Sequence, residues 1–88
     1  MSRPNALYLK AHAHAFAGRF DAARGLLGEA LGLYPEGGAR ARILYLQAWI
    51  LLQEGDSGAA VPLLKDVVRN HSSTKYARQA LRVLESLE

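Results

Sequence analysis

The chain has 88 residues and no cysteine, which limits it to one small domain and excludes disulfide bonds and thiolate metal sites. Its longest uninterrupted apolar run, residues 48–52, is far shorter than the ~20 residues needed to span a bilayer, so we expect no membrane insertion. The formal net charge of +3 comes from basic residues scattered through the first half of the chain, a pattern that disfavours nucleic-acid binding, which concentrates Lys and Arg on one face.

The hydrophobic pattern predicts an all-α chain. In chain order, the predicted helices span residues 5–17, 21–33, 39–54, 58–70 and 74–87. The alternation of apolar and polar residues that marks a strand is nowhere sustained, and the abundant Ala and Leu are strong helix formers. The third predicted helix is apolar almost all the way round, so it needs neighbours on more than one side.

Glycines mark the turns between paired helices. Gly18 and Gly55 each stand just past a predicted helix, where a left-handed conformation is needed and only glycine adopts it without steric cost. Asp21 in the first pair, and Asp56 or Ser57 in the second, can cap the helix that follows. Each pair is therefore predicted to be a helix, a tight turn and a helix.

Other breaker residues separate these pairs and shape the helix ends. Pro35 with residues 37–38 closes the first pair, and residues 71–73 close the second, with Ser73 as the predicted cap of the last helix. Pro62 falls in or near the first turn of the fourth helix, and it predicts a late or tightened start there.

The two predicted helix pairs have similar sequences. Five matching pairs of residues are each 37 positions apart: Gly18 and Gly55, Ala23 and Ala60, Leu26 and Leu63, Leu27 and Leu64, and Leu31 and Val68. One helix pair cannot bury its apolar face alone, so the two copies are expected to cover each other.

The segment GRFDAARGLLGEALGLYP, residues 18–35, resembles the second half of a tetratricopeptide repeat. Gly18 lies at the turn, Phe20 is the aromatic residue, Ala23 and Ala30 lie where helices cross, and Pro35 ends the unit. The second copy is similar at Gly55, Asp56, Ala60 and Leu64, but Ser57, Val67 and Ser72 replace the usual aromatic, alanine and proline. The resemblance implies one α-solenoid domain, with repeats at about 5–35 and 39–72 and a capping helix at about 74–87.

Residues suited to catalysis or metal binding do not gather in the sequence. His12 and His14 are two positions apart, so on a helix they point to different sides and cannot share a metal ion. His71 is expected in a solvated loop, and the acidic residues fit helix caps or surface charges better than a paired acid and base. We therefore expect no enzyme activity, no metal and no cofactor.

Aromatic residues recur at helical spacing in the first helix of each pair. Tyr8, His12 and Phe16 are separated by four residues each, and Tyr45, Trp49 and Gln53 repeat that spacing. The tetratricopeptide resemblance implies that the first helices line a concave groove. The predicted partner-binding residues are Tyr8, His12, Phe16, Arg42, Tyr45, Trp49, Gln53, Tyr76 and Gln79. The alternative is that the aromatic stripe, Phe16 and Tyr45 included, belongs to the core.

These observations favour a noncatalytic protein-interaction module. Arg42 is the one cation expected in the groove, so the predicted partner is a mainly apolar or aromatic protein segment. The alternative is an oligomerisation or assembly scaffold in which an end face is buried against a second copy as a homodimer. The N-terminus lacks the layout of a secretory signal, so a cytoplasmic location is expected. A periplasmic location is expected instead if the chain is an excised domain of a bacterial cell-envelope protein, which the stretch from Arg69 to Leu87 resembles.

Overall fold

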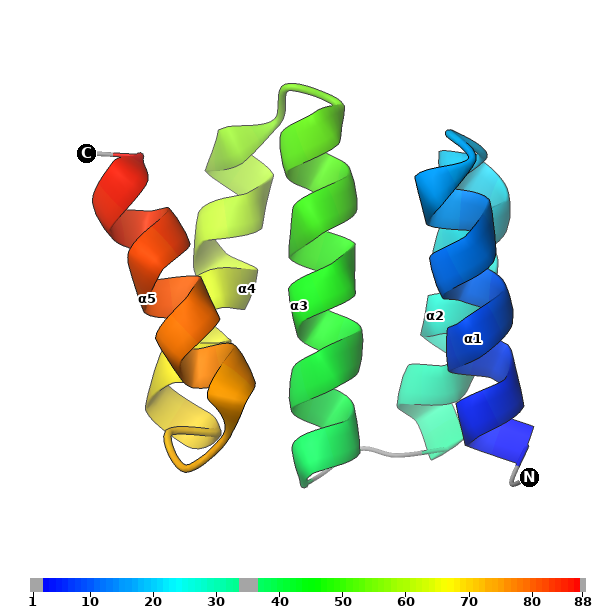
Figure 1. Ribbon diagram of the computed structural model, residues 1–88, viewed down its shortest axis with the longest axis horizontal. Coiled ribbons are helices and arrows are strands. Elements are labelled where there is room, and N and C mark those ends of the chain that lie inside the picture. Colours follow the sequence, from blue (N-terminus) through cyan, green and yellow to red (C-terminus); the bar gives the residue numbers. More distant parts are fainter. Residues whose placement is uncertain (1–2, 34–36, 88) are drawn as a thin grey trace.

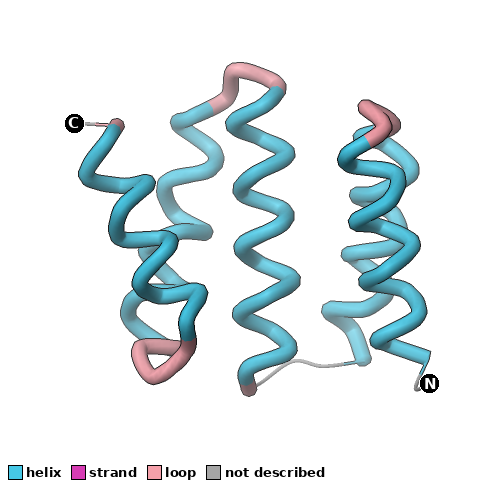
Figure 2. The backbone as a smooth tube through the Cα atoms, viewed as in Figure 1, coloured by secondary structure: helices cyan, strands magenta, loops and turns pink. Residues whose placement is uncertain are grey.

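Five helices and the turns between them account for the described chain in the computed structural model, with no strand in those ranges (Figures 1 and 2). The structure describes residues 3–33 and 37–87, with side chains from Asn5 onward. The helices are α1 Arg3–Phe16, α2 Phe20–Leu33, α3 Gly38–Gln53, α4 Ser57–Asn70 and α5 Lys75–Ser86. The all-α prediction is confirmed, and each helix bound lies within two residues of its predicted position.

The helices form two layers. In Figure 1, α1, α3 and α5 lie in the nearer layer, and α2 and α4 lie behind them. The Cα atoms extend over 36 × 28 × 17 Å, and the shortest dimension fits two layers of helices at the usual interaxial distance of about 8 to 10 Å. The first helix of each pair therefore lies on the same side of the molecule as α5.

The turns at Gly18 and Gly55 have the same geometry, as the sequence repeat predicts. Both glycines have a φ of 81°. The amide of Arg19 donates to the carbonyl of His14 over 2.8 Å, and the amide of Asp56 donates to that of Leu51, again over 2.8 Å. These bonds close the last helical turn across a left-handed glycine, so the repeat extends to individual backbone hydrogen bonds.

Side-chain capping agrees with the sequence prediction in one helix and differs in two. The Asp56 carboxylate accepts from the amide of Ala59 over 3.1 Å, which confirms it as the cap of α4. The cap predicted at Asp21 is wrong, because α2 begins one residue earlier and Asp21 lies inside its first turn. The cap predicted at Ser73 is also wrong. Thr74 directly precedes α5 in an extended conformation, and its hydroxyl accepts from the amide of Ala77 over 3.3 Å.

Pro62 does not delay α4, so that prediction is wrong. The helix begins at Ser57 and continues through the proline. A proline at this position removes one hydrogen-bond donor near the helix start, and the Asp56 cap and the buried Ala60 and Leu64 hold the helix on either side. The predicted break at Pro35 lies outside the described residues, and Gly37, with a φ of 86°, directly precedes α3.

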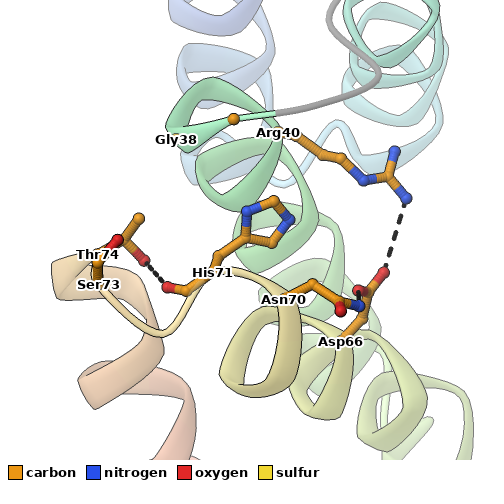
Figure 3. A pocket seen from close by; sticks show the side chains of 8 residues that line it. Gly38, Arg40, Asp66, Asn70, His71, Ser73 and Thr74 are labelled. Carbon is orange, nitrogen blue, oxygen red and sulfur yellow. Dashed lines mark hydrogen bonds and ion pairs between the residues drawn. The ribbon is translucent and has the colours of Figure 1, made fainter.

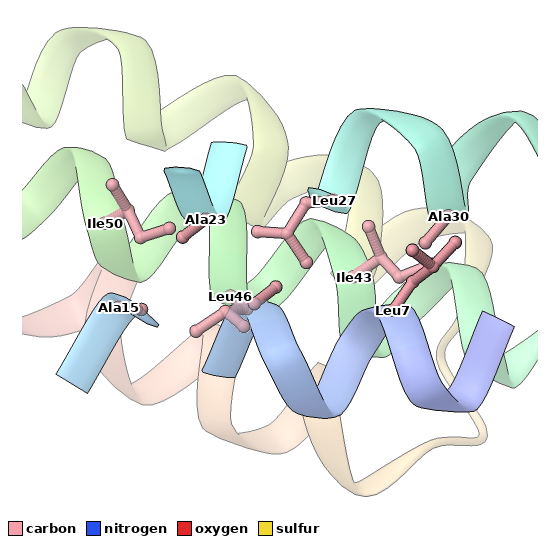
Figure 4. Packing of buried hydrophobic residues seen from close by; sticks show 9 residues of the cluster. Leu7, Ala15, Ala23, Leu27, Ala30, Ile43, Leu46 and Ile50 are labelled. Carbon is pink, nitrogen blue, oxygen red and sulfur yellow. The ribbon is translucent and has the colours of Figure 1, made fainter. Parts of the chain in front are cut away.

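Two apolar clusters form the interior, and α3 belongs to both. The first cluster joins α1 and α2 to one side of α3 through Ile43, Leu46 and Ile50 (Figure 4). The second joins α4 and α5 to the other side of α3, whose contributing residues are Ala41, Leu44 and Ala48. The predicted need of the third helix for neighbours on more than one side is thereby confirmed.

Candidate functional site

Three aromatic rings follow one side of α1, as their spacing predicts. The ring centroids of Tyr8 and His12 are 6.1 Å apart, and those of His12 and Phe16 are 4.4 Å apart. Phe16 ends the row with 61% of its surface exposed, although it is a large apolar side chain. Such exposure excludes a core position for Phe16 and marks this end of the row as accessible surface.

Trp49 of α3 joins this row to the neighbouring helix pair. Its ring stacks on Phe16 at a centroid distance of 4.5 Å and an interplanar angle of 23°. Phe20 of α2 meets the indole edge-on at 6.5 Å and 75°. Trp49 is half-buried and also packs against the first apolar cluster, so it serves both as surface and as part of the interior.

A second aromatic pair links α3 with α5. The rings of Tyr45 and Tyr76 lie 6.0 Å apart, and both side chains are half-buried against the second apolar cluster. Burial raises the pKa of Tyr45. Burial also raises the pKa of Tyr8, and the nearby Tyr76 raises it further while Arg42 lowers it. We call Tyr8, His12, Phe16, Tyr45, Trp49 and Tyr76 the aromatic face.

Two cations border the aromatic face at the N-terminal ends of α3 and α5. The Arg42 guanidinium lies 3.9 Å from the centroid of the Tyr8 ring and donates to Asn5 Oδ1 over 3.0 Å. The Lys75 ammonium lies 5.3 Å from the centroid of the Tyr76 ring. Both cations line a cleft of about 400 Å³ together with Asn5 and Tyr76. We call this the Arg42 cleft.

The structure brings most of the predicted binding residues together and leaves two apart. The six rings and Arg42 form the contacts described above, whereas Gln53 and Gln79 are exposed without a side-chain interaction to the described residues. Sequence reasoning missed Lys75, because Arg42 was expected to be the one cation in the groove. The position of Lys75 beside Tyr76, at the start of the last helix, was the available signal. Sequence reasoning also did not assign Phe20 to this surface.

A second, polar cleft of about 600 Å³ lies between the start of α3 and the α4–α5 turn (Figure 3). Arg40 reaches toward Asp66 at 3.6 Å, and Asn70 donates to the other carboxylate oxygen over 2.5 Å. His71 lines this cleft with 9% of its surface exposed, and its buried Nε2 has no hydrogen-bond partner among the described residues. The prediction of a solvated His71 is therefore wrong, because the ring turns inward after the last residue of α4.

No described part of the chain holds three or more His, Asp or Glu side chains close enough to bind a metal ion. His12 lies in the aromatic row, while the Nδ1 atom of His14 accepts a hydrogen bond from Arg19 over 2.8 Å. Within the described ranges, no helix has the length and apolar character required to cross a membrane. The aromatic face and the Arg42 cleft together present six rings, two cations and the Asn5 amide.

Comparisons of this chain with models of known protein families, with curated proteins and with solved structures find no match.

Proposed function

We propose that this chain is a noncatalytic interaction module that binds a segment of a partner protein across its aromatic face. The observation that carries the proposal is the continuous row of half-buried and exposed rings that crosses from α1 to α3, together with the Tyr45–Tyr76 pair that reaches α5. The tetratricopeptide resemblance supports the same face, because it implies that the first helices of successive pairs line the binding groove.

The residue types of this face suit protein recognition. Binding hot spots are enriched in Trp, Tyr and Arg, and the rigid rings of Trp and Tyr bury much surface at a small cost in conformational entropy. Trp49 and Tyr45 are anchored by the interior behind them, so a ligand would meet rings that are already ordered. Binding to an ordered surface loses less entropy than binding to a mobile one.

The partner segment is proposed to be mainly apolar or aromatic, with an acidic group at one end. An apolar side chain would cover the exposed Phe16 and its stacked neighbour Trp49. A carboxylate in the Arg42 cleft would meet both Arg42 and Lys75. This differs from the sequence-based expectation of a single cation, and it favours a segment that carries a carboxylate.

The test is selection of peptides from a random displayed library on the wild-type chain, followed by calorimetric titration of the enriched peptides. We expect Phe16→Ala to weaken binding by about 2 kcal/mol, the threshold of a hot-spot contact. Leu33→Ala is the matched control, because Leu33 is an exposed apolar residue on α2, in the other helix layer. Circular dichroism melts establish that both variants remain folded.

Two results would contradict the proposal. One is a library in which no peptide is enriched. The other is enriched peptides that bind equally well to the wild-type chain, to Phe16→Ala and to Arg42→Gln. Phe16 is a better probe than Trp49, since truncation of the half-buried indole would disturb the first apolar cluster as well as the surface. Trp49, the single tryptophan, then serves as the fluorescent reporter of binding.

A further inference from the structure

The polar cleft between the start of α3 and the α4–α5 turn has a buried nitrogen without a partner in its wall. His71 lines this cleft, and only 9% of its surface is exposed. Its ring points from the turn toward the start of α3 (Figure 3), and Nε2 has no hydrogen-bond partner among the described residues. A buried polar atom without a partner lowers stability, because nothing offsets its desolvation. A group that enters the cleft and bonds to Nε2 removes that cost.

The start of α3 adds hydrogen-bond donors to the same cleft. The first amides of a helix have no acceptor within the helix, and Gly37, which directly precedes α3, has no side chain that could cap them. Gly37 and Gly38 both line the cleft. Such amides and the partial positive charge at a helix start together attract anions.

The charged residues near this helix start favour an anion as well. The first turn of α3 contains Arg40 and no acidic residue. A cation is unfavourable beside the positive end of a helix, so this placement costs stability unless a negative group lies near. By contrast, Asp21 lies in the first turn of α2, and Asp56 caps α4. A bound anion would therefore stabilise the start of α3.

We propose that the polar cleft binds a phosphate group. Its donors are the first amides of α3, the Arg40 guanidinium, Nε2 of His71 and the hydroxyl of Ser73, which makes no hydrogen bond to the described residues. These four kinds of donor come from two segments, the start of α3 and the α4–α5 turn. They need more acceptors than the two oxygens of a carboxylate, and a phosphate group offers at least three.

Hydrogen bonds hold the turn that carries His71 and Ser73. The Thr74 hydroxyl donates to the carbonyl of His71 over 2.7 Å, and the Thr74 amide donates to the same carbonyl over 3.0 Å. The amide of His71 donates to the carbonyl of Val67 over 3.0 Å. A phosphate group would therefore meet donors that are already ordered, which lowers the entropy lost on binding.

Asp66 is the acidic residue among those that line the polar cleft, and it opposes an anion. Its carboxylate accepts from Asn70 over 2.5 Å and lies 3.6 Å from the Arg40 guanidinium. The contact with Arg40 is longer than a normal hydrogen bond, so Arg40 can turn toward a phosphate without losing a strong ion pair. Removal of the Asp66 charge is therefore expected to strengthen phosphate binding.

This site is separate from the one proposed for the partner segment. Arg40 and Asp66 line the polar cleft and not the Arg42 cleft, whereas Arg42 and Lys75 line the Arg42 cleft alone. Phosphate binding can therefore be measured without any peptide ligand, and its failure would leave the proposed binding at the aromatic face untouched.

The test is titration of the isotope-labelled chain with sodium phosphate, followed by NMR, with sodium chloride at matched ionic strength as the control. The amides of Gly38 and Ala39 and the ring of His71 are expected to shift in one saturable step with phosphate and not with chloride. Arg40→Gln is expected to weaken binding about tenfold, since it removes a charge-assisted contact. Asp66→Asn is expected to strengthen binding severalfold.

Matched variants separate this site from general effects of charge and folding. Arg82→Gln makes the same change at an exposed arginine of α5 that does not line the cleft, and it is expected to leave the affinity unchanged. His71→Phe keeps a ring but removes both nitrogens. It is expected to weaken phosphate binding without lowering the melting temperature, because the buried atom without a partner is gone. If His71→Phe does not fold, Ser73→Ala tests the same turn at an exposed position.

A second ligand identifies the source of the phosphate group. Phosphoserine blocked at both ends, with blocked serine as its control, is titrated in the same way. Tighter binding of blocked phosphoserine than of inorganic phosphate supports the site and assigns it to a phosphorylated protein segment, and the reverse order supports it as a site for the free ion. Absence of a saturable shift at millimolar phosphate overturns the proposal. So does binding that Arg40→Gln leaves unchanged or that Arg42→Gln weakens more, since the ion would then lie elsewhere.

Discussion

The α2–α3 and α4–α5 junctions occupy equivalent places in the two repeats, yet α5 packs much more closely along α4 than α3 does along α2. Residues 37 positions apart explain the difference. Ala77 and Ala80 of α5 correspond to Arg40 and Ile43 of α3. Small side chains allow two helix backbones to approach, whereas a branched side chain at the same place holds them apart.

The α1–α2 pair is consequently the more weakly attached part of the molecule. Its described links to the remainder are the large residues of the first apolar cluster, the ring contacts of Trp49, the contacts of Arg42 with α1, and the partly exposed Arg24–Glu54 ion pair. The sequence of α2 adds to this weakness. A Cβ atom added at Gly25, Gly28 or Gly32 would meet nothing within 4 Å, so each glycine costs α2 about 1 kcal/mol of helix propensity without improving its packing. The turns are alike in the two repeats, and the junction residues set how firmly each helix pair is held.

The largest effect is expected from truncation of Ile50, which is fully buried between α3 and the α1–α2 pair. Ile50→Ala is expected to lower the free energy of unfolding by about 2 to 5 kcal/mol, because it leaves a cavity. Hydrogen exchange should accelerate first in α1 and α2 and least in α4 and α5. If the alanine variant does not fold, Ile50→Val gives the same pattern at smaller amplitude. Equal acceleration in all five helices would show that the two regions are not separable.

The role of small residues at the α4–α5 junction can be tested by introducing there the side chain found at the α2–α3 junction. Ala80→Ile gives the tight α4–α5 junction the residue found at the looser one, and we expect it to cost about 1 to 3 kcal/mol through overpacking. Ala80 has no exposed surface, so the added atoms cannot turn toward solvent. Urea denaturation measures the change. A variant as stable as the wild type would refute the role of small residues at this junction.

For the two glycine turns, unlike the two junctions, we expect equal losses of stability on substitution. Gly18→Ala and Gly55→Ala should each cost about 1 to 2 kcal/mol, because alanine is strained at a φ of 81°. An added Cβ meets no atom within 4 Å at either position, so no steric clash adds to the backbone strain. Thermal melts of the two variants should therefore shift alike. Unequal shifts would indicate that the two turns differ in the unfolded state or in their neighbours.

The smallest expected difference in stability is that between alanine variants of the two aspartates near the starts of α2 and α4. Asp56→Ala removes a side-chain cap and should cost about 1 kcal/mol. Asp21→Ala should change the melting temperature little, since Asp21 makes an exposed ion pair with Arg24 and caps nothing. A larger loss for Asp21 than for Asp56 would reverse the assignment of the caps.

The sequence predicted helix positions well because its signals were local. The helix ends marked by Gly18 and Gly55 depend little on tertiary contacts. The same holds for the helical periodicity of the apolar residues. One wrong prediction concerns a position where two adjacent residues could each cap the same helix. Thr74 rather than Ser73 caps α5, because the cap must directly precede the helix in an extended conformation. His71 is buried because the chain turns inward between α4 and α5, which its own position in the sequence does not reveal.

For the candidate site, helical spacing predicted which rings share a side of each helix but not how deeply they are buried. The contacts between helices, such as the stack of Phe16 on Trp49, depend on how α1 and α3 are placed relative to each other. The approach of Lys75 to Tyr76 and of Arg42 to Tyr8 depends on side-chain direction at helix starts. Neither follows from periodicity, so the composition of the site was predictable and its electrostatics were not.

The membership of α3 in both apolar clusters has a kinetic consequence. Contacts among α3, α4 and α5 join helices that are close in sequence and closely packed, so the entropy lost in closing the intervening loops is small. We expect the folding transition state to contain these three helices, with the α1–α2 pair joining afterwards. Substitutions that disturb only the packing of the α1–α2 pair against α3 should then leave the folding rate nearly unchanged and accelerate unfolding, since these contacts form after the barrier.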